Sequence, residues 1–291
     1  MNNVKSGHVC PIVCLDAGHY GKYNRSPVVP QFYESEFNWK LHNFLAAELE
    51  QYGIKVRKTR SDSDVDLSLT ERGKQAKECD LFLSLHANAA DNESANYVLG
   101  ICMVDDACGE IDAQSKDVAK LLSDCVAEVM DAQSVVWSKE SSKDRDGNGK
   151  KDDYYGVLRG THSVGTPGVI LEHGFFTNKK QAQMLLDDRN LQLLAEAEAK
   201  VLADWFGVTK SVLGNPYSLL LMSQRKGCKG HQVEAIQAML IAKGYFCGNT
   251  GVDGSFGART EAAVRAYQTD MEMLVDGIVG KETISGLLGY R

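Results

Sequence analysis

GVILEHGFF, residues 168–176, places three aliphatic side chains directly before a glutamate, Glu172. A continuous apolar run of this kind is typical of a central strand that is buried on both faces of a sheet. Glu172 would then stand at the carboxyl end of the strand, which is the edge where open α/β sheets bind their ligands. The segment therefore predicts a buried strand that ends at a functional site.

Two earlier apolar runs end in histidine in a similar way. Residues 12–18 lead to His19, and residues 81–85 lead directly to His86. Parallel strands place their carboxyl ends at one edge of a sheet, so His19, His86 and Glu172 are expected to lie together there. Two imidazoles and a carboxylate have the composition of a hydrolytic zinc site with its general base. We therefore expect one Zn2+ ion in the catalytic domain.

The third zinc ligand is expected to be a carboxylate, because a catalytic zinc site uses three protein ligands and keeps one position for water. Glu34 and Glu36 both lie at the start of a predicted helix, and their spacing does not choose between them. Glu172 remains as the general base. Asp16 either orients an imidazole through a hydrogen bond or forms the turn before Gly18, and the sequence leaves both interpretations open.

Strands and helices alternate along residues 12–206, with short connections. This alternation predicts an α/β fold with a three-layer, mostly parallel sheet and flanking helices. Ser35 is the expected N-cap of the first helix, and Gly53 ends that helix. Strands are expected at residues 12–16, 54–57, 81–86, 97–104 and 168–172, and helices at 34–52, 69–77, 115–132, 180–186 and 190–206.

A break in the pattern separates two predicted domains. Residues 208–222 contain Gly214-Asn215-Pro216 and no helical period, which indicates a linker. The catalytic domain is therefore expected at residues 1–207 and a second domain at residues 223–291.

The formal net charge of −7 is unevenly distributed. From Tyr217 onward the chain has 8 of its 32 Lys and Arg residues and 7 of its 39 Asp and Glu residues, which leaves 24 basic and 32 acidic residues before that point. An acidic main domain argues against nucleic acid as a partner, because phosphate contacts need a basic face. The eight cysteines form no C-x-x-C pair, and several lie inside apolar runs, which favours reduced thiols over a disulfide framework.

Several short motifs follow one another in a specific order and spacing: Asp16-x-Gly-His19, Glu34 with Asn38, Thr59-Arg60, Ser84 to Asn88, and Leu171 to Phe175 with Asn178. In these motifs the chain, from residue 12 to 206, resembles the zinc-dependent N-acetylmuramoyl-L-alanine amidases of bacterial autolysins and phage endolysins, the amidase_3 family. The resemblance implies His19, Glu34 and His86 as zinc ligands and Glu172 as the catalytic glutamate. It favours Glu34 over Glu36, because the family's ligand stands four residues before an asparagine.

The resemblance implies hydrolysis of the amide between the lactyl group of N-acetylmuramic acid and L-alanine of the stem peptide, with zinc-activated water and Glu172 as base. Two departures are visible: Tyr20 stands where the family often has glycine, and His173 stands where many members have a small or apolar residue. His173 could contact the oxyanion, although a packed structural histidine is favoured. Arg60 and Asn88 are further candidates for supporting the site or contacting substrate, with an ordinary salt bridge favoured for Arg60.

Residues 253–257 and 276–280 are two Asp-Gly-x-x-Gly turns, each followed by a threonine three residues later. Helical patterns precede both turns, so this internal repeat predicts a small all-α module. Residues 226–288 resemble the small peptidoglycan-binding domain, which implies three helices and attachment of the enzyme to the cell wall. Peptidoglycan is thus the expected partner of both domains, and the oligomeric state is expected to be monomeric.

The alternatives are another zinc-dependent wall hydrolase, such as a deacetylase or peptidase, and a catalytically inactive wall-binding protein. No apolar run approaches the roughly 18 residues of a membrane helix, so no membrane insertion is expected. Residues 1–7 lack the apolar core of a signal peptide. Extracellular action on the bacterial wall then fits either a phage or prophage endolysin or a mature or trimmed secreted protein.

The loop from residue 144 to 152 partly matches a calcium loop. Its oxygen-bearing side chains stand at positions 1, 3, 5 and 9 with glycine at position 6, but position 12 is Tyr155, so the closing bidentate carboxylate is missing. A solvated acidic loop is favoured over a Ca2+ site. The residues concerned are Asp144, Asp146, Asn148, Lys150 and Asp152.

Overall fold

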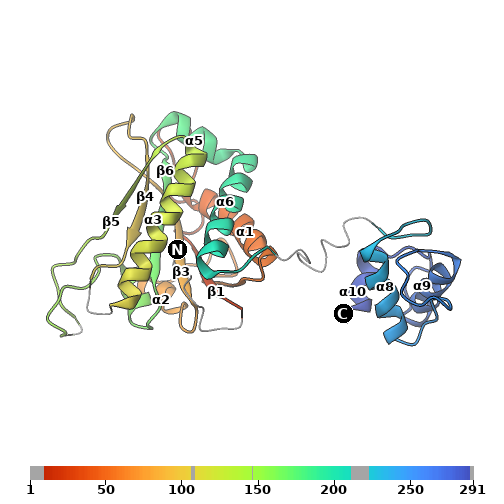
Figure 1. The fold of residues 1–291 in the computed structure, drawn as a ribbon. Helices are drawn as coiled ribbons and strands as arrows, with labels where there is room; N and C mark the ends of the chain where they lie inside the picture. The colour runs from red at the N-terminus through yellow and green to blue at the C-terminus, as the bar shows by residue number, and fades with distance from the viewer. Residues whose placement is uncertain (1–9, 106–108, 146, 211–222, 289–291) are drawn as a thin grey trace. The chain divides into compact units, whose positions relative to one another are not determined.

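The computed structural model describes residues 10–105, 109–145, 147–210 and 223–288 (Figure 1). The chain divides into two compact units, residues 1–210 and 211–291. Most of the predicted linker, residues 211–222, lies outside the described residues, so the linker and the domain bounds stay predictions. None of the described helices has the length and apolarity that crossing a bilayer requires.

The first unit has a central sheet with helices on both faces, and this confirms the predicted fold class. Its strands are β1 (Ile12–Ala17), β2 (Lys55–Lys58), β3 (Leu81–Asn88), β4 (Tyr97–Cys102), β5 (Gln133–Trp137) and β6 (Gly168–Phe175). Its helices are α1 (Glu34–Gln51), α2 (Leu69–Lys74), α3 (Glu110–Met130), α4 (Gly156–His162), α5 (Lys179–Leu186) and α6 (Asp188–Phe206).

The strands lie in the order β2-β1-β3-β6-β4-β5. The first four are parallel to one another, whereas β4 runs antiparallel to β6 and β5 runs parallel to β4. The carboxyl ends of β1, β3 and β6 therefore meet at one edge, beside the amino end of β4. This edge is where the three apolar runs deliver their polar residues.

The two faces of the sheet are covered unequally. Val13, Leu15 and Leu83 belong to a large core with α1, α3 and α6, whereas Phe82 and Ile170 point to the opposite face, into a smaller core with residues of α4. The alternation follows from the strand geometry, because successive side chains point to opposite faces. Since α2 and α4 have only six and seven residues, the second face is covered by short helices.

One expectation about local structure is wrong, and two elements were not predicted. Tyr33, rather than Ser35, is the N-cap of α1, and the Ser35 hydroxyl instead accepts a hydrogen bond from the Tyr23 backbone N–H at 2.7 Å. The short edge strand β5 was not predicted, since its half-exposed residues carry little apolar signal. Helix α4 was not predicted either, because two of its residues are glycines, which weaken a helical pattern.

The glycines of α2 and α4 allow the two helices to pack closely, which the sequence pattern does not predict. A Cβ at Gly73 would lie 2.0 Å from the Val157 carbonyl oxygen, and one at Gly160 would lie 2.3 Å from the Thr70 carbonyl oxygen. The two helices thus pack backbone against backbone. This close contact brings α2, with Arg72, against the turn that follows β1.

The second unit contains α8 (His231–Ala242), α9 (Ala258–Asp270) and α10 (Lys281–Leu287). Two buried glutamines explain its sequence repeat. Gln237 donates to Asp253 at 2.8 Å and to Thr260 at 3.1 Å. Gln268 makes the same bonds to Asp276 and Thr283, at the same two distances. Each Asp-Gly turn and its threonine therefore close around one buried amide.

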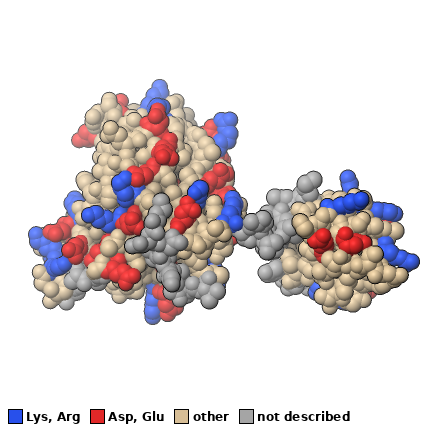
Figure 2. Space-filling model, viewed as in Figure 1, with Lys and Arg blue, Asp and Glu red and all other residues tan. Residues whose placement is uncertain are grey.

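Acidic and basic side chains are interspersed on the face of the first unit that is in view (Figure 2). The described residues on this face therefore offer no continuous basic surface for a polyphosphate. The seven cysteines within the described residues are free.

Candidate metal centre and active site

The turn after β1 brings His19 against β3. His19 has a φ of 59°, in the left-handed region that non-glycine residues rarely adopt. Position 18 has no room for a side chain, because a Cβ there would lie 2.2 Å from Cε1 of His86. The absence of a Cβ at Gly18 therefore lets the His19 turn lie directly on the His86 ring.

Glu34, the first residue of α1, lies between the two imidazoles. Its Oε2 is 3.1 Å from Nε2 of His19, and its Oε1 is 2.9 Å from Nδ1 of His86. The Glu34 side chain is only 3 % exposed, whereas those of His19 and His86 are 29 % and 19 % exposed. One ligand atom from each residue lies within 4.8 Å of the others. The structure thus brings together His19, Glu34 and His86.

These three side chains fit a zinc ion by their chemistry. Two imidazole nitrogens and a carboxylate are ligands that zinc prefers, and three protein ligands are the number that a catalytic zinc site uses. Glu36, the other carboxylate that the sequence left open, instead lies 3.7 Å from Nζ of Lys22. The imidazoles are in addition partly open to solvent, as a site that admits water and substrate requires.

The charges of this cluster are strongly coupled. Burial raises the pKa of Glu34, but hydrogen bonds with His19 and His86 outweigh it and hold that pKa well below its usual range. Burial lowers the pKa of His86, but the hydrogen bond and charge of Glu34 outweigh it and raise that pKa to about 9. Positive charge is therefore stabilised beside Glu34, and a bound cation could supply that charge in place of a protonated imidazole.

Glu172 lies next to this cluster. It is the register partner of His86 on the neighbouring strand, so the two side chains leave the same face of the sheet. Burial raises the pKa of Glu172 to about 7. Its Oε2 is buried without a hydrogen-bond partner among the described residues. A carboxylate with a pKa near neutral is suited to accept and return a proton.

Asp16 is held by partners other than an imidazole. It accepts hydrogen bonds from the Thr59 hydroxyl at 2.6 Å and the Ser84 hydroxyl at 2.7 Å, and Nη1 of Arg72 lies 3.4 Å away. Within the described residues no hydrogen bond joins Asp16 to His19 or His86, so the structure does not support the idea that Asp16 orients a ligand directly.

Two arginines brace the turn that carries His19. Arg72 donates to the carbonyl oxygens of Ala17 and His19, both at 3.1 Å. Arg60 donates to the same Ala17 oxygen at 3.0 Å, and its guanidinium lies 4.7 Å from the ring centre of Trp39. Arg60 is thus buried in a supporting role rather than exposed for a substrate carboxylate. Sequence reasoning missed Arg72, because a single arginine on a short helix carries no distinct signal.

Asn24 was also missed. Its amide nitrogen donates to Oε2 of Glu34 at 2.6 Å and lies 3.2 Å from Nε2 of His19. With a φ of 53°, Asn24 is the second residue in the connection between β1 and α1 that adopts the left-handed conformation, after His19. Asparagine tolerates this conformation, which is the one signal that could have identified it.

His173 lies on the opposite face of the sheet from Glu172, as alternation along a strand requires. It is fully buried, with Nδ1 2.9 Å from the His86 carbonyl oxygen and Nε2 3.1 Å from Glu198. His173 is therefore a packed structural histidine, the favoured interpretation, and is not placed to contact an oxyanion. Asn88 stands where the pairing of β3 with β6 is irregular, and its side-chain oxygen accepts from the Ala89 N–H at 2.8 Å.

The described part of the 144–152 loop gives calcium no support. Asp152 forms an ion pair with Arg145 and accepts a hydrogen bond from the Arg145 N–H at 3.0 Å. Asp144 accepts from the backbone N–H groups of Gly147 and Gly149, at 2.7 and 2.9 Å, so its oxygens close a turn. Asp146 lies outside the described residues. The carboxylates of Asp144 and Asp152, two of the ligands that the motif would supply, are thus engaged within the described part of the loop.

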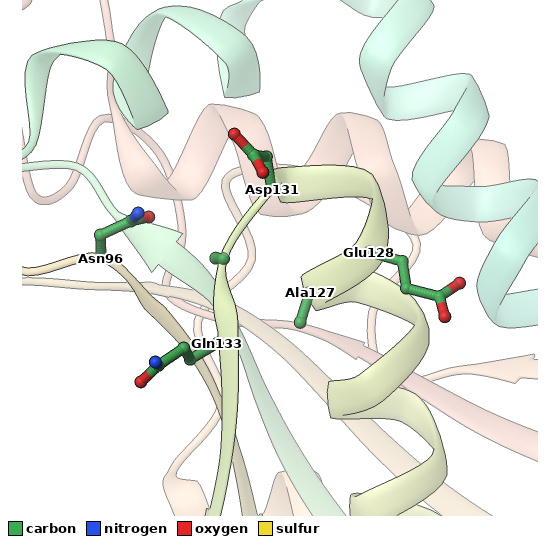
Figure 3. A pocket seen from close by; sticks show the side chains of 6 residues that line it. Asn96, Ala127, Glu128, Asp131 and Gln133 are labelled. Carbon is green, nitrogen blue, oxygen red and sulfur yellow. The ribbon is translucent and has the colours of Figure 1, made fainter.

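A hollow of about 450 Å³ lies on the same edge of the sheet, beyond β6 (Figure 3). Asn96 precedes β4, whose amino end lies beside the carboxyl end of β6. The side chains of Asn96, just before β4, and Gln133, at the start of β5, flank the hollow, while Glu128 points away (Figure 3). The hollow is lined by Asn96, Ala127, Glu128, Asp131, Ala132 and Gln133, so it is separate from the His–Glu–His cluster.

Comparison with known proteins agrees with this geometry. Residues 13–204 match the family described as N-acetylmuramoyl-L-alanine amidase, Amidase_3. The chain belongs to this family. Residues 229–287 of the amidase match the family described as putative peptidoglycan binding domain. The enzyme is therefore an N-acetylmuramoyl-L-alanine amidase, a peptidoglycan hydrolase of the cell wall.

Relatives of the amidase differ in how much of it they cover. It is 29% identical to the endolysin of Bacillus phage SPP1 over 211 residues, which are 70% of this chain and 69% of the endolysin. It is 43% identical to the N-acetylmuramoyl-L-alanine amidase CwlL of Bacillus licheniformis over 63 residues, 22% of this chain and 18% of CwlL. The solved catalytic domain of CwlV from Bacillus (Paenibacillus) polymyxa var. colistinus shares its fold, with a TM-score of 0.56 and 22% identity over 68% of this chain and 99% of that domain.

Proposed function

We propose that His19, Glu34 and His86 hold one zinc ion and that Glu172 is the general base of the amidase. The observation that carries the proposal is the convergence of three ligand atoms within 4.8 Å. The register pairing of His86 with Glu172 supports it, because the pairing puts a carboxylate with a raised pKa beside the cluster.

When bound, zinc would act as a Lewis acid that polarises a carbonyl and increases the acidity of water. The protein's own residues do the rest. Glu172, through its unpartnered Oε2, takes a proton from the attacking water and returns it to the amine of L-alanine as the amide breaks. Asn24 keeps the Glu34 carboxylate in place, and Arg72 fixes the backbone of His19. The bond that is cleaved joins the lactyl carbonyl of N-acetylmuramic acid to that alanine.

Two neighbouring glutamates provide a matched test of the metal site. Glu34→Gln removes a charge from the cluster, whereas Glu36→Gln removes one from a side chain that pairs with Lys22. We expect elemental analysis to find zinc in the wild-type protein and in Glu36→Gln, and a marked loss of both zinc and amidase activity in Glu34→Gln. Equal zinc content in the two variants would contradict Glu34 as a ligand.

The second unit is proposed to attach the enzyme to peptidoglycan without taking part in catalysis. The family match over residues 229–287 supports this role, and so does the separation of the chain into two compact units. Attachment would raise the concentration of substrate around the catalytic unit. We further propose that residues 208–222 are a linker and that the enzyme acts as a monomer outside the cell, either as an endolysin or as a secreted autolysin.

A further inference from the structure

Two exposed tyrosines lie beside the proposed metal centre, in the connection between β1 and α1. Tyr20 and Tyr23 are 37% and 51% exposed. Their ring centres are 5.8 Å apart, and the Tyr23 ring is nearly parallel to the His19 imidazole, at 5.5 Å and 7°. Tyr20, Tyr23 and His19 thus form a continuous row of rings that begins at a proposed zinc ligand. We call Tyr20 and Tyr23 the tyrosine shelf.

The backbone of the shelf is fixed although its rings are exposed. The Tyr23 N–H donates to the Ser35 hydroxyl at 2.7 Å, and the Gly21 N–H donates to the Ser63 carbonyl oxygen at 2.9 Å. These bonds tie the segment to α1 and to the loop after β2. Neither tyrosine hydroxyl hydrogen-bonds to another residue within the described parts of the chain. The shelf is therefore a preformed surface whose rings and hydroxyls are open to a ligand.

Touching aromatic rings that remain exposed beside a catalytic centre are typical of a binding surface. Single exposed apolar residues are common and need no explanation, but contiguous ones mark interaction sites. Tyrosine is suited to such a site, because its ring packs against apolar C–H surface and its hydroxyl can hydrogen-bond. The ligand should therefore offer a flat C–H face with polar groups at its rim.

The substrate has such a group close to the bond that is cleaved. The scissile carbonyl carbon is joined through the lactyl Cα and an ether oxygen to a pyranose ring, by three bonds of roughly 1.5 Å each. The sugar must therefore lie within a few ångströms of the reacting carbonyl, a distance comparable to the 5.5 Å between His19 and Tyr23. On the other side of the bond, the stem peptide begins with alanine, which has no ring to stack.

We propose that the tyrosine shelf binds the pyranose ring of the N-acetylmuramoyl residue and makes the amidase selective for substrates that keep this sugar. The proposal rests on the proposed function, because it assumes that catalysis occurs at the His19, Glu34 and His86 cluster. Tyr20 and Tyr23 are specificity residues here and take no part in proton transfer.

Two soluble substrates test the shelf. One is a disaccharide muropeptide, and the other is the same stem peptide carrying a lactyl group in place of the muramoyl group. We expect Tyr23→Ala to lower kcat/KM for the muropeptide about tenfold, mainly through KM, which is the effect of losing one well-packed apolar contact. Its kcat/KM for the lactyl peptide should change less than about twofold. Tyr20→Ala should show the same selectivity with a smaller effect.

Three controls separate sugar binding from support of His19. Tyr23→Phe keeps the ring and should retain most of the preference for the muropeptide. Trp137→Ala removes a ring of similar exposure, 48%, on β5, and should not change the preference. The zinc content of the Tyr20 and Tyr23 variants should equal that of the wild type, since the shelf supplies no ligand.

Equal losses on both substrates in Tyr23→Ala would overturn the proposal, because the ring would then only hold His19. Unchanged kinetics on both substrates would overturn it as well. The proposed function is tested separately, by digestion of whole peptidoglycan with wild-type enzyme. Wild-type enzyme that cleaves peptidoglycan but shows no preference for the muropeptide would overturn the shelf alone.

Discussion

His86 and Glu172 are register partners on adjacent parallel strands, β3 and β6. The distance between a proposed zinc ligand and the proposed base is therefore set by the sheet itself, the most rigid part of the fold. The other two ligands come from a turn and a helix start. Arg72 donates to the His19 carbonyl oxygen, the Ala87 N–H of β3 donates to Glu34, and the absence of a Cβ at Gly18 lets the turn lie on the His86 ring. Placing reacting groups on rigid elements preserves their geometry during turnover.

Replacing Glu172 should separate catalysis from metal binding. Glu172→Gln keeps the size of the side chain but cannot accept a proton, so we expect hydrolysis to fall about 10²- to 10⁴-fold while zinc content is unchanged. Amidase assays and elemental analysis of the same preparation measure both. Activity within a factor of a few of the wild type would remove Glu172 from the mechanism.

Activity should fall in acid. Glu172 must be ionised to accept a proton, and burial raises its pKa to about 7. A zinc ion nearby would lower that pKa, because positive charge favours the carboxylate. We therefore expect the acid limb of kcat/KM to have its midpoint between about 4.5 and 7. A pH profile with no decline in this window would contradict the assignment of Glu172 as the base.

Gly18→Ala should damage the metal centre without changing a ligand. The new Cβ would lie 2.2 Å from the His86 ring, so either the ring or the His19 turn must move. Displacing groups that position ligands typically lowers metal affinity about 10- to 100-fold, and competition with a zinc chelator measures it. Gly257→Ala is the control, since a Cβ there has nothing within 4 Å. Equal zinc affinity in both variants would show that the Gly18 turn is more adaptable than its packing indicates.

Removing the second unit should affect wall binding more than catalysis. We expect a protein lacking residues 217–291 to sediment with purified walls at least about tenfold less, since one of its two binding modules is lost. Its rate on a small soluble muropeptide should stay within about twofold of the full chain, because the first unit has its own core. Parallel losses in both assays would mean that residues 217–291 belong to the catalytic unit.

The strands and the cluster were accessible to sequence reasoning because buried parallel strands read as continuous apolar runs, and the residue after such a run falls at the ligand-binding edge. His86 and Glu172 follow this rule directly, and His19 lies two residues beyond the end of β1. The pattern was less informative for His173, since the neighbour of a catalytic residue on a strand points to the opposite face. Here it binds Glu198 instead.

The supporting residues could not be predicted for a different reason. Arg72 contacts residues that are distant in the sequence, and Asn24 lies on an irregular loop, so their contacts leave no periodic pattern in the sequence. Helix α4 was hidden by Gly156 and Gly160, which suit close packing against α2 and weaken the helical signal. In α4, close packing against α2 outweighs the low helix propensity of the two glycines.

The most direct test of the central claim is end-group analysis of purified peptidoglycan digested by the full-length protein, with and without a zinc chelator. The account predicts new N-terminal alanine, no new reducing sugar ends, and loss of the activity when zinc is removed. Free glucosamine amines, or new amino termini on other stem residues, would contradict cleavage of the muramoyl–alanine amide. Undiminished formation of N-terminal alanine in the chelator, by protein shown to be free of zinc, would contradict the metal centre.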